Sequence, residues 1–258
     1  MPEGDTIHRA AERIGAALGG SVPDEVLTPH PRHRFDRWPE RLAARALLGA
    51  EARGKHLLLH FEGELALHSH LRMTGLWGIG PTGERWRRSP RRAWLVLRGR
   101  GFDVVEFDGP LLELLTETRV RSHPQLTALG GDVLGERFDE RAFLARLRED
   151  DPTRGFGDAL LDQHNVAGIG NLWKSETCFA VAIDPWRRVA EIADEEALAA
   201  VGYARERMRA AVRGGVDSRP RAVYRRAGLP CPRCGATIRE RGQGDNNRVT
   251  YWCPGCQR

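Results

Sequence analysis

Four of the chain's five cysteines form two short pairs near its end, Cys231-Pro-Arg-Cys234 and Cys253-Pro-Gly-Cys256. Each pair can turn both thiolates toward one point, and the 18 residues between the pairs are enough for a β-hairpin that brings them together. We therefore predict one structural, tetrahedral Zn²⁺ ion. Two disulfides in a secreted protein are the alternative, but the acidic start of the chain, with no apolar segment behind it, does not resemble a secretory signal.

Because a closed four-sulfur site is structural, the catalytic chemistry must lie elsewhere, and the first residues offer it. The chain begins Met1-Pro2-Glu3-Gly4, and a small second residue normally allows removal of the initiator methionine. Pro2 would then present a secondary amine, and an α-amino group titrates near roughly 7.7–8.0, so part of it is nucleophilic at neutral pH. Glu3 is placed for general acid catalysis on a sugar ring or leaving group. An ordinary Met-Pro start without function is the alternative.

The charge of the chain favours a polyanionic partner. The formal net charge is +5 over 258 residues, with a sequence pI of about 9.2. From position 219 to the end there are nine arginines against two acidic residues, so the cysteine-rich segment is also strongly basic. Nucleic acid is the favoured partner, and a solvated basic tail is the alternative. Among the 40 basic residues only Lys55 and Lys174 are lysines, which singles out both for a specific role.

Hydrophobic patterning predicts the elements that must position these groups. Residues 6–18 have helical periodicity, and Gly19-Gly20 ends that helix. Between positions 22 and 123, short β-rich runs alternate with Gly, Pro and Asp, a pattern typical of a β-sandwich. The predicted strands cover residues 55–61, 64–70, 93–97 and 103–107, and an Arg- and Gly-rich loop is expected at 80–92.

Helical patterns dominate after Pro124. The last predicted helix begins with Asp194 as its N-cap and ends at Gly214-Gly215. Predicted helices cover residues 139–148, 157–163, 171–180 and 194–212. The expected fold is therefore a multidomain α+β chain, with a helix and β-sandwich at 1–124, a linker at 125–138, a helical domain at 139–222 and a zinc hairpin at 223–258. No apolar run is long enough to span a membrane, and a reducing compartment is expected.

A glycine-punctuated turn joins two of these helices. Gly168-Ile-Gly170 leads into a helix that starts at Asn171, and a tight turn into a helix N-terminus exposes backbone N–H groups that can bind a phosphate. Asn171 could add a side-chain donor to such a site. The alternative is a plain contact between helices with Asn171 as a cap.

Together these segments resemble the formamidopyrimidine-DNA glycosylase and endonuclease VIII family of base-excision repair enzymes. The matching motifs span almost the whole chain: Pro2-Glu3-Gly4, Arg53-Gly-Lys55-His-Leu-Leu-Leu, His70-Leu-Arg-Met-Thr-Gly75, Leu160-Leu-Asp-Gln with Gly168-Ile-Gly-Asn171-Leu-Trp-Lys-Ser-Glu176, Val223-Tyr-Arg-Arg-Ala-Gly-Leu-Pro-Cys231, and Asn247-Arg248-Val-Thr-Tyr-Trp-Cys-Pro-Gly-Cys-Gln257. The resemblance implies a helix-two-turn-helix domain, a zinc-finger hairpin and damaged DNA as the partner. It also implies a bacterial, cytoplasmic, nucleoid-associated enzyme, which we expect to act as a monomer.

The resemblance also implies roles for single residues. Pro2 would attack the deoxyribose C1′ with Glu3 as the acid, and Lys55, Asn171 and Arg248 would each contact a DNA phosphate, with Lys55 and Arg248 near the reacting nucleotide. Met73 would be an apolar wedge that fills the space of a flipped nucleotide, with an ordinary core position as the alternative. The implied activity is that of a DNA glycosylase and AP lyase that cleaves the backbone by β,δ-elimination. A non-catalytic damaged-DNA binding protein on the same fold is the other hypothesis.

Four departures from the family pattern bear on the reaction or its specificity. Thr6 stands where the family usually has a second glutamate, and the stretch 108–114 lacks the expected Arg and Phe beside the wedge. The formamidopyrimidine branch has a long lid before the zinc hairpin, whereas only seven residues, Val216 to Ala222, stand here. Gly4 also replaces the usual Leu of that branch. The short segment and Gly4 predict a preference for oxidised pyrimidines and abasic sites over 8-oxoguanine, whereas Thr6 bears on the later elimination steps and the stretch 108–114 on the preference for the opposite base.

Histidines alternate on two neighbouring predicted strands. His56, His60, His68 and His70 could form a second metal site or could lie on polar faces of the sandwich. The polar-face interpretation is favoured. Cys178, the fifth cysteine, lies in an apolar helical segment and is expected to be an ordinary buried thiol.

Overall fold

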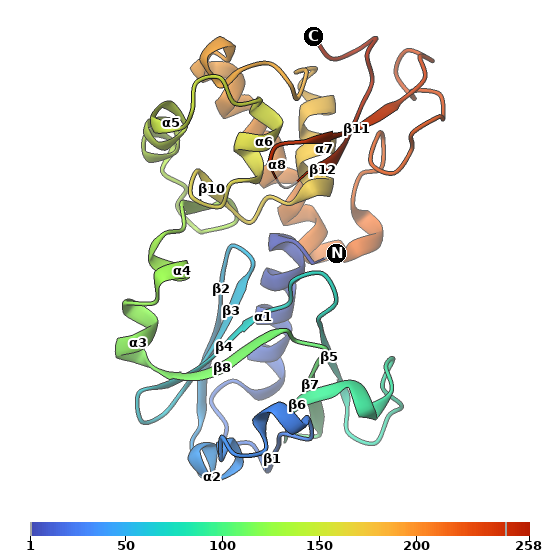
Figure 1. Ribbon diagram of the computed structural model, residues 1–258. Coiled ribbons are helices and arrows are strands. Elements are labelled where there is room, and N and C mark those ends of the chain that lie inside the picture. The colour runs from blue at the N-terminus through green and yellow to red at the C-terminus, as the bar shows by residue number, and fades with distance from the viewer. Residues whose placement is uncertain (1, 246) are drawn as a thin grey trace. The chain divides into compact units, whose positions relative to one another are not determined.

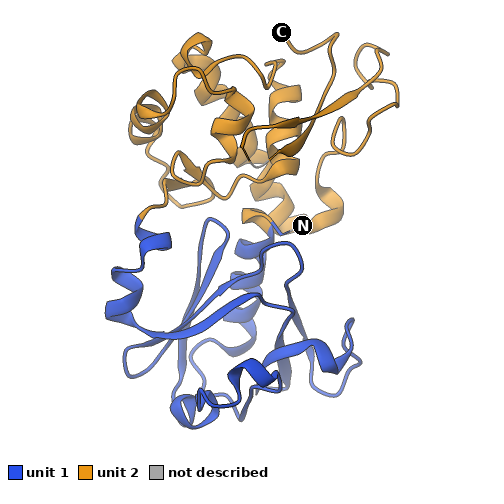
Figure 2. Ribbon diagram, in the orientation of Figure 1, with its two compact units in different colours: residues 1–2, 6–127 blue, residues 3–5, 128–258 orange. Residues whose placement is uncertain are grey.

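The computed structural model describes residues 2–245 and 247–258 and divides them into two compact units (Figure 2). Unit 1 contains Pro2 and Thr6–Thr127, and unit 2 contains Glu3–Asp5 and Ala128–Arg258. Glu3–Asp5 therefore makes its contacts with unit 2, although these residues directly precede the main part of unit 1 in sequence. Among the described residues, no helix is both long and apolar enough to cross a membrane.

Unit 1 is a β-sandwich with a helix, as the sequence predicted (Figure 1). Two four-stranded antiparallel sheets have the strand orders β1-β6-β7-β5 and β2-β3-β4-β8. One sheet consists of β1 (Glu25–Leu27), β5 (Leu76–Pro81), β6 (Ala93–Gly99) and β7 (Phe102–Phe107). The other consists of β2 (Leu47–Arg53), β3 (His56–Phe61), β4 (Leu65–His70) and β8 (Leu111–Thr116). Shorter helical elements are α2 (Trp38–Leu42), η1 (Pro31–His33), η2 (Pro90–Arg92), α3 (Glu117–Arg121) and α4 (Pro124–Thr127).

A single apolar core joins helix α1 (Gly4–Leu18) to both sheets. The helix contributes Ile7, Ile14 and Leu18, whose spacing places them on one face, and all three are buried. Alternate residues of β3 and β4 point into the same core, with Leu57 and Leu67 as examples. The opposite side chains of these two strands carry the histidines. The core therefore fixes which face of the sheet the histidines occupy.

Unit 2 is helical, with a β-hairpin near its end. Its helices are α5 (Glu140–Glu149), α6 (Phe156–Leu161), α7 (Asn171–Ala180), α8 (Asp194–Gly214), η3 (Val189–Glu191) and η4 (Val216–Ser218). Strands β11 (Arg239–Gln243) and β12 (Arg248–Trp252) form the antiparallel hairpin. Trp173 on α7 is fully buried and packs in a core with residues from α5, α6 and α8. Helix α7 therefore lies at the centre of the unit.

Helix α8 begins one residue earlier than expected. Ala193 is its N-cap, and Asp194, predicted as the cap, is the first helical residue. The Ala193 N–H donates to the Glu196 side chain at 2.9 Å, so a carboxylate from the first turn satisfies the cap instead. Gly215 ends the helix with φ of 81°, as predicted.

The segment predicted as a linker, residues 125–138, contains short elements of its own. Helix α4 covers its start, and β9 (Gly131–Asp132) pairs in parallel with β10 (Val166–Ala167). The division between the two units falls after Thr127. The domain boundaries drawn from sequence stay predictions.

Candidate active site and nucleic-acid interface

Glu3 is held at the N-terminus of α7. Its carboxylate accepts the backbone N–H of Leu172 at 2.9 Å through one oxygen and that of Trp173 at 3.3 Å through the other. These are two of the first-turn N–H groups that have no partner within a helix, and the helix dipole favours negative charge there. With only 1 % of its surface exposed, Glu3 is fixed in position and shielded from bulk water.

Two glycines of the turn before α7 make this approach possible. The Gly4 N–H donates to the Gly168 carbonyl at 2.9 Å, and a Cβ on Gly4 would lie 2.9 Å from the Gly168 Cα. A Cβ on Gly170 would lie 2.2 Å from the Glu3 Cδ. The N–H groups of Leu172 and Trp173 are engaged by Glu3, so a phosphate contact at this turn, which stays a prediction, would need other donors.

Asn171 connects α7 to the strand that carries Arg248. The N-cap of α7 is Gly170, so the capping alternative for Asn171 was wrong. Its Nδ2 donates to the Val249 carbonyl at 2.7 Å, while its buried Oδ1 has no protein partner. Arg248 is exposed at the start of β12, where it pairs in register with Gln243. Asn171 thus lies beside the proposed phosphate contact of the hairpin.

The interior of α7 connects this hairpin to the rest of unit 2. Lys174 is completely buried, and its Nζ donates to the Thr250 hydroxyl at 2.5 Å; burial lowers the pKa of Lys174 to about 8. Thr250 in turn donates to Gln243, so that both hairpin strands are engaged. Glu176 accepts three backbone N–H groups, from Ala222, Val223 and Tyr224, at 2.7 to 2.9 Å.

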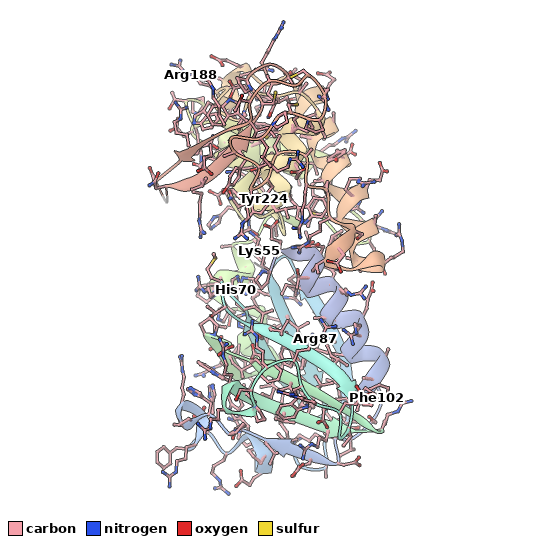
Figure 3. The ribbon with its side chains drawn as sticks, turned by 90° about the vertical axis from the view of Figure 1, so that its right-hand side faces the viewer. Lys55, His70, Arg87, Phe102, Arg188 and Tyr224 are labelled. Atoms are coloured by element: carbon pink, nitrogen blue, oxygen red, sulfur yellow. The ribbon has the colours of Figure 1, made fainter. Side chains whose placement is uncertain are left out.

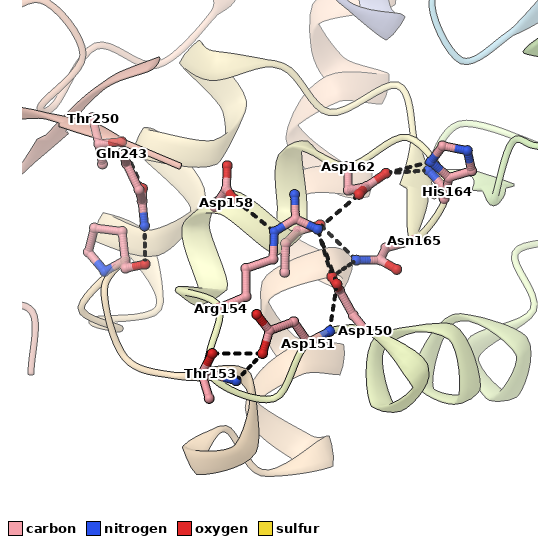
Figure 4. Close-up of polar contacts among 12 residues, drawn as sticks. Asp150, Asp151, Thr153, Arg154, Asp158, Asp162, His164, Asn165, Gln243 and Thr250 are labelled. Carbon is pink, nitrogen blue, oxygen red and sulfur yellow. Dashed lines mark hydrogen bonds and ion pairs between the residues drawn. The ribbon is translucent and has the colours of Figure 1, made fainter. Parts of the chain in front are cut away.

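Arg154 forms the densest charged network of unit 2 (Figure 4). Its guanidinium donates to Asp150, Asp158 and Asp162 at 2.8 to 2.9 Å. Burial opposes the charge of Arg154, but hydrogen bonds to Asp162 and Asp158 outweigh this and raise its pKa. The network ties the segment before α6 to α6 itself and to the residue that follows it.

The four clustered cysteines fit one zinc ion. The sulfur pairs Cys231–Cys256 and Cys234–Cys253 lie 3.8 and 3.4 Å apart. All four sulfurs lie within 4.8 Å of one another. A disulfide needs about 2.05 Å, whereas thiolates around a tetrahedral zinc at about 2.3 Å lie near these separations. The predicted single structural zinc is therefore supported. Cys178 is fully buried, and burial raises the pKa of its thiol to about 12, which makes it inert.

Lys55 and Met73 lie at the same end of one sheet of unit 1. Lys55 precedes β3, and Met73 lies in the loop after β4; the two strands pair with His56 opposite His70. Figure 3 shows Lys55 close to His70. Met73 is 56 % exposed, so the alternative of an ordinary core residue was wrong. An exposed apolar side chain on a loop is what insertion into a base stack requires.

Arg88, which sequence reasoning did not single out, holds the loop of Met73. Its Nη1 donates to the Thr74 carbonyl at 2.8 Å and also to the Asp108 carboxylate. Thr74 donates to the Asp108 carbonyl at 3.4 Å. Asp108 and Arg88 therefore both hold the loop that carries Met73.

The histidines of β3 and β4 lie on the face of the sheet opposite the apolar core; His56 and His68 are buried there, and His60 and His70 are partly exposed. A chain of contacts runs from His56 to His68 at 2.8 Å, from His68 to Glu113 at 2.8 Å, and from Glu113 to His123 at 3.2 Å. Burial lowers the pKa of His56 to about 2 and that of His70 to about 4. Ligand atoms of His68, Glu113 and His123 lie close enough for a metal ion, but hydrogen bonds already account for both ring nitrogens of His68.

Comparisons with known proteins match the whole chain. Family models match residues 1–107 (Formamidopyrimidine-DNA glycosylase N-terminal domain), 129–220 (Formamidopyrimidine-DNA glycosylase H2TH domain) and 228–258 (Zinc finger found in FPG and IleRS). Probable endonuclease 8 2 of Streptomyces coelicolor is 40% identical, over 100% of this chain and 94% of that protein. DNA-(apurinic or apyrimidinic site) lyase Nei2 of Mycolicibacterium smegmatis is 36% identical, over 100% and 99%. Endonuclease 8 of Escherichia coli is 32% identical over the full length of both chains.

Solved structures share the fold. Lactococcus lactis Fpg in complex with abasic-site DNA superposes with a TM-score of 0.83 over 100% of both chains, at 23% identity. The same enzyme bound to DNA containing an oxidised pyrimidine gives the same TM-score at 24% identity. At this identity the likeness establishes the architecture alone.

Proposed function

The chain belongs to the formamidopyrimidine-DNA glycosylase and endonuclease VIII family and is a DNA glycosylase and AP lyase of DNA repair, and we propose that Pro2 is its nucleophile. The observation that carries this proposal is the placement of Glu3. A buried carboxylate is costly unless it is well paired, and here a helix N-terminus and two glycines are devoted to holding one next to Pro2. A protein that only bound DNA would not need this arrangement.

In the proposed reaction, the secondary amine of Pro2 attacks C1′ of the damaged nucleotide. The bond between C1′ and the base nitrogen breaks, and the base leaves with the electron pair and takes up a proton. Glu3 gives a proton to the opening sugar ring, and the N-terminus of α7 stabilises the carboxylate that remains. The amine loses its own proton, so an iminium links Pro2 to the sugar. β-Elimination then removes a proton from C2′ and breaks the bond from C3′ to its phosphate oxygen. δ-Elimination removes a proton from C4′ and breaks the bond from C5′ to its phosphate oxygen, and water hydrolyses the iminium and releases Pro2.

The proposed DNA contacts come from both units. Lys55 in unit 1 and Asn171 and Arg248 in unit 2 contact phosphates, and Met73 fills the space left by the flipped nucleotide. The exposure of Met73 and Arg248 supports these roles. Asn171 holds the hairpin strand through Val249, which supports a role next to Arg248. We further propose that the protein acts as a monomer on bacterial DNA in the cytoplasm.

The proposed substrates are oxidised pyrimidines and abasic sites. The segment Val216–Ala222 between α8 and the zinc hairpin is short, and its first residues form the compact turn η4. Backbone contacts of Ala222 with Glu176 further anchor its end. So short and anchored a segment is poorly suited to close over a purine ring system.

Two assays test this proposal. Borohydride should trap the protein covalently on thymine-glycol DNA, whereas Pro2→Gly should bind the same DNA without trapping. Single-turnover excision of thymine glycol should exceed that of 8-oxoguanine opposite cytosine. Wild-type protein that binds but never traps would favour the non-catalytic binder, and faster excision of 8-oxoguanine would overturn the substrate preference.

A further inference from the structure

A buried ion pair joins the first helix to the segment after α8. The Arg219 guanidinium donates to both oxygens of Asp5, from Nε and from Nη2, each at 2.6 Å. The side chains are only 7 % and 2 % exposed. The two residues are separated by 214 positions, and both belong to unit 2. This bidentate geometry adds directional specificity to the energy of the ion pair.

Stability alone is a weak explanation for such a pair. Removing two charges from water costs several kcal/mol per ion, and well-packed apolar residues of similar volume often stabilise a protein equally well. Burial opposes the charge of Arg219, but the hydrogen bonds and charge of Asp5, followed by the charge of Glu3, outweigh this and raise its pKa. Arg219 therefore interacts electrostatically with Glu3 as well as binding Asp5.

The pair completes a set of contacts that fix the residues after Pro2. Glu3 is held by the N-terminus of α7, Gly4 donates to the Gly168 carbonyl, and Asp5 is held by Arg219. Three consecutive residues are thus anchored to three different segments of unit 2. The contact of Asp5 is the only one of these three made by two charged side chains, and it depends on a residue outside the glycine turn and α7.

The same pair also anchors the short segment Val216–Ala222. At its start, the Ser218 hydroxyl donates to the Gly215 carbonyl at 2.6 Å. At its end, the Ala222 N–H donates to Glu176 at 2.8 Å. Arg219 lies between these two anchors, so the segment is held at its start, middle and end.

We propose that Asp5 and Arg219 are positioning residues, which hold the Pro2-Glu3 segment against the reacting sugar and keep the segment Val216–Ala222 in one fixed conformation. This inference rests on the proposed function. The pair acts through Glu3 and through the conformation of this segment. Proper orientation of a nucleophile can contribute several orders of magnitude to a rate, so loosening the segment should slow chemistry more than binding.

The test is an apolar replacement of the whole pair, Asp5→Leu with Arg219→Met. Because no unpaired buried charge remains, the double variant should keep the thermal stability of the wild type, unlike Arg219→Met alone. We expect its single-turnover excision and borohydride trapping to fall roughly 100-fold, with DNA affinity changed less than about threefold. Arg219→Lys keeps the charge but loses the bidentate hydrogen bonding, and its excision rate should lie between those of the wild type and the double variant. Glu196→Gln, which breaks the partly exposed pair with Arg187, is the matched control and should leave the rate unchanged.

Amide hydrogen exchange of residues 216–222 gives a second readout that needs no catalysis. Exchange there should rise at least tenfold in the double variant and stay unchanged in the control. A stable double variant with wild-type rate and wild-type exchange would overturn the proposal. If borohydride never traps the wild-type protein on DNA, the proposed function fails. Unchanged amide exchange in the double variant would separately refute the anchoring role of the Asp5–Arg219 pair.

Discussion

Two regions bury polar groups in this protein, and they do so in opposite ways. In unit 2, Glu3 and Asp5 are charged side chains that accept hydrogen bonds from fixed backbone or guanidinium donors. In unit 1, His56 and His68 are packed together, and burial lowers the pKa of both. The first arrangement fixes directions in space, as catalysis requires. The second arrangement packs neutral histidines on the outer face of a sheet, so the stability of unit 1 depends on pH.

The unpaired atoms show the same contrast. Both carboxylate oxygens of Glu3 and of Asp5 accept hydrogen bonds from donors in unit 2. In the histidine cluster, by contrast, the buried Nδ1 of His123 has no protein partner. Positioned charges tolerate little displacement, whereas a cluster of neutral rings can exchange partners. We therefore expect substitutions near Glu3 to act on rate and substitutions in the histidine cluster to act on stability.

The largest expected effect comes from Gly170→Ala. The new methyl group would lie 2.2 Å from the Glu3 Cδ, so the carboxylate must leave the N-terminus of α7. We expect excision and trapping to fall by roughly 10²–10³-fold, because the proton donor loses its position. Gly202→Ala, where a Cβ meets nothing within 4 Å, is the matched control. Near-normal trapping by Gly170→Ala would contradict the role assigned to the turn.

Removal of zinc should affect unit 2 and spare unit 1. The hairpin has a small apolar cluster around Val223 and Ile238, so metal binding must supply much of its stability. Chelation or Cys234→Ser should displace Arg248 and weaken DNA binding by roughly 10-fold or more, while the β-sandwich keeps its far-ultraviolet circular dichroism. Full affinity in protein shown by metal analysis to lack zinc would refute this prediction.

Acid should destabilise unit 1 through its buried histidines. The pKa falls from 6.5 to about 2 for His56 and to about 4 for His70, so between those values and 6.5 the unfolded chain binds more protons than the folded one. Stability is therefore lost as the pH falls below 6.5, by on the order of 2–4 kcal/mol in total at pH 5. Urea unfolding at pH 7.5 and 5.0 measures the loss. His70→Leu should reduce this acid-induced loss of unfolding free energy by about half. An unchanged loss would show that other groups are responsible.

The smallest expected effects concern phosphate contacts. Lys55→Ala and Arg248→Ala should each weaken binding similarly for different lesions, and each should flatten the dependence of log Kd on log salt by roughly one unit. Asn171→Ala should weaken binding without changing this slope, because it carries no charge. Arg141→Ala on α5 is the control, since its exposed side chain lies outside the proposed interface. A changed lesion preference with unchanged affinity would indicate base reading instead.

Local signals in the sequence predicted most of the fold. Helix α7 runs from Asn171 to Ala180, as its pattern indicated, and the two cysteine pairs predicted the zinc site. The N-cap of α8 was misplaced, because Asp194 and Glu196 are both plausible capping acids in sequence and only the folded backbone distinguishes them. Glu3 was identified as a candidate, but not the helix that holds it.

Long-range partners could not be predicted in this way. Arg219 was one arginine among nine in a basic segment, and nothing near it in sequence indicates Asp5 as its partner. Glu176 belongs to a recognisable motif, yet its three backbone donors lie 46 to 48 residues further on. Gly170 was linked to phosphate binding because such turns often bind phosphate, whereas here the protein's own carboxylate fills that position.

The central claim is that Glu3 and its anchors present Pro2 as the nucleophile. The most direct test is to map the borohydride-trapped adduct by peptide mass spectrometry on protein with its native N-terminus. The chain has only two lysines, Lys55 and Lys174, so few other amines compete. The account predicts that the sugar fragment is found on the N-terminal peptide, attached to Pro2, and that Lys55→Arg and Lys174→Met still form it. An adduct on either lysine would contradict the account.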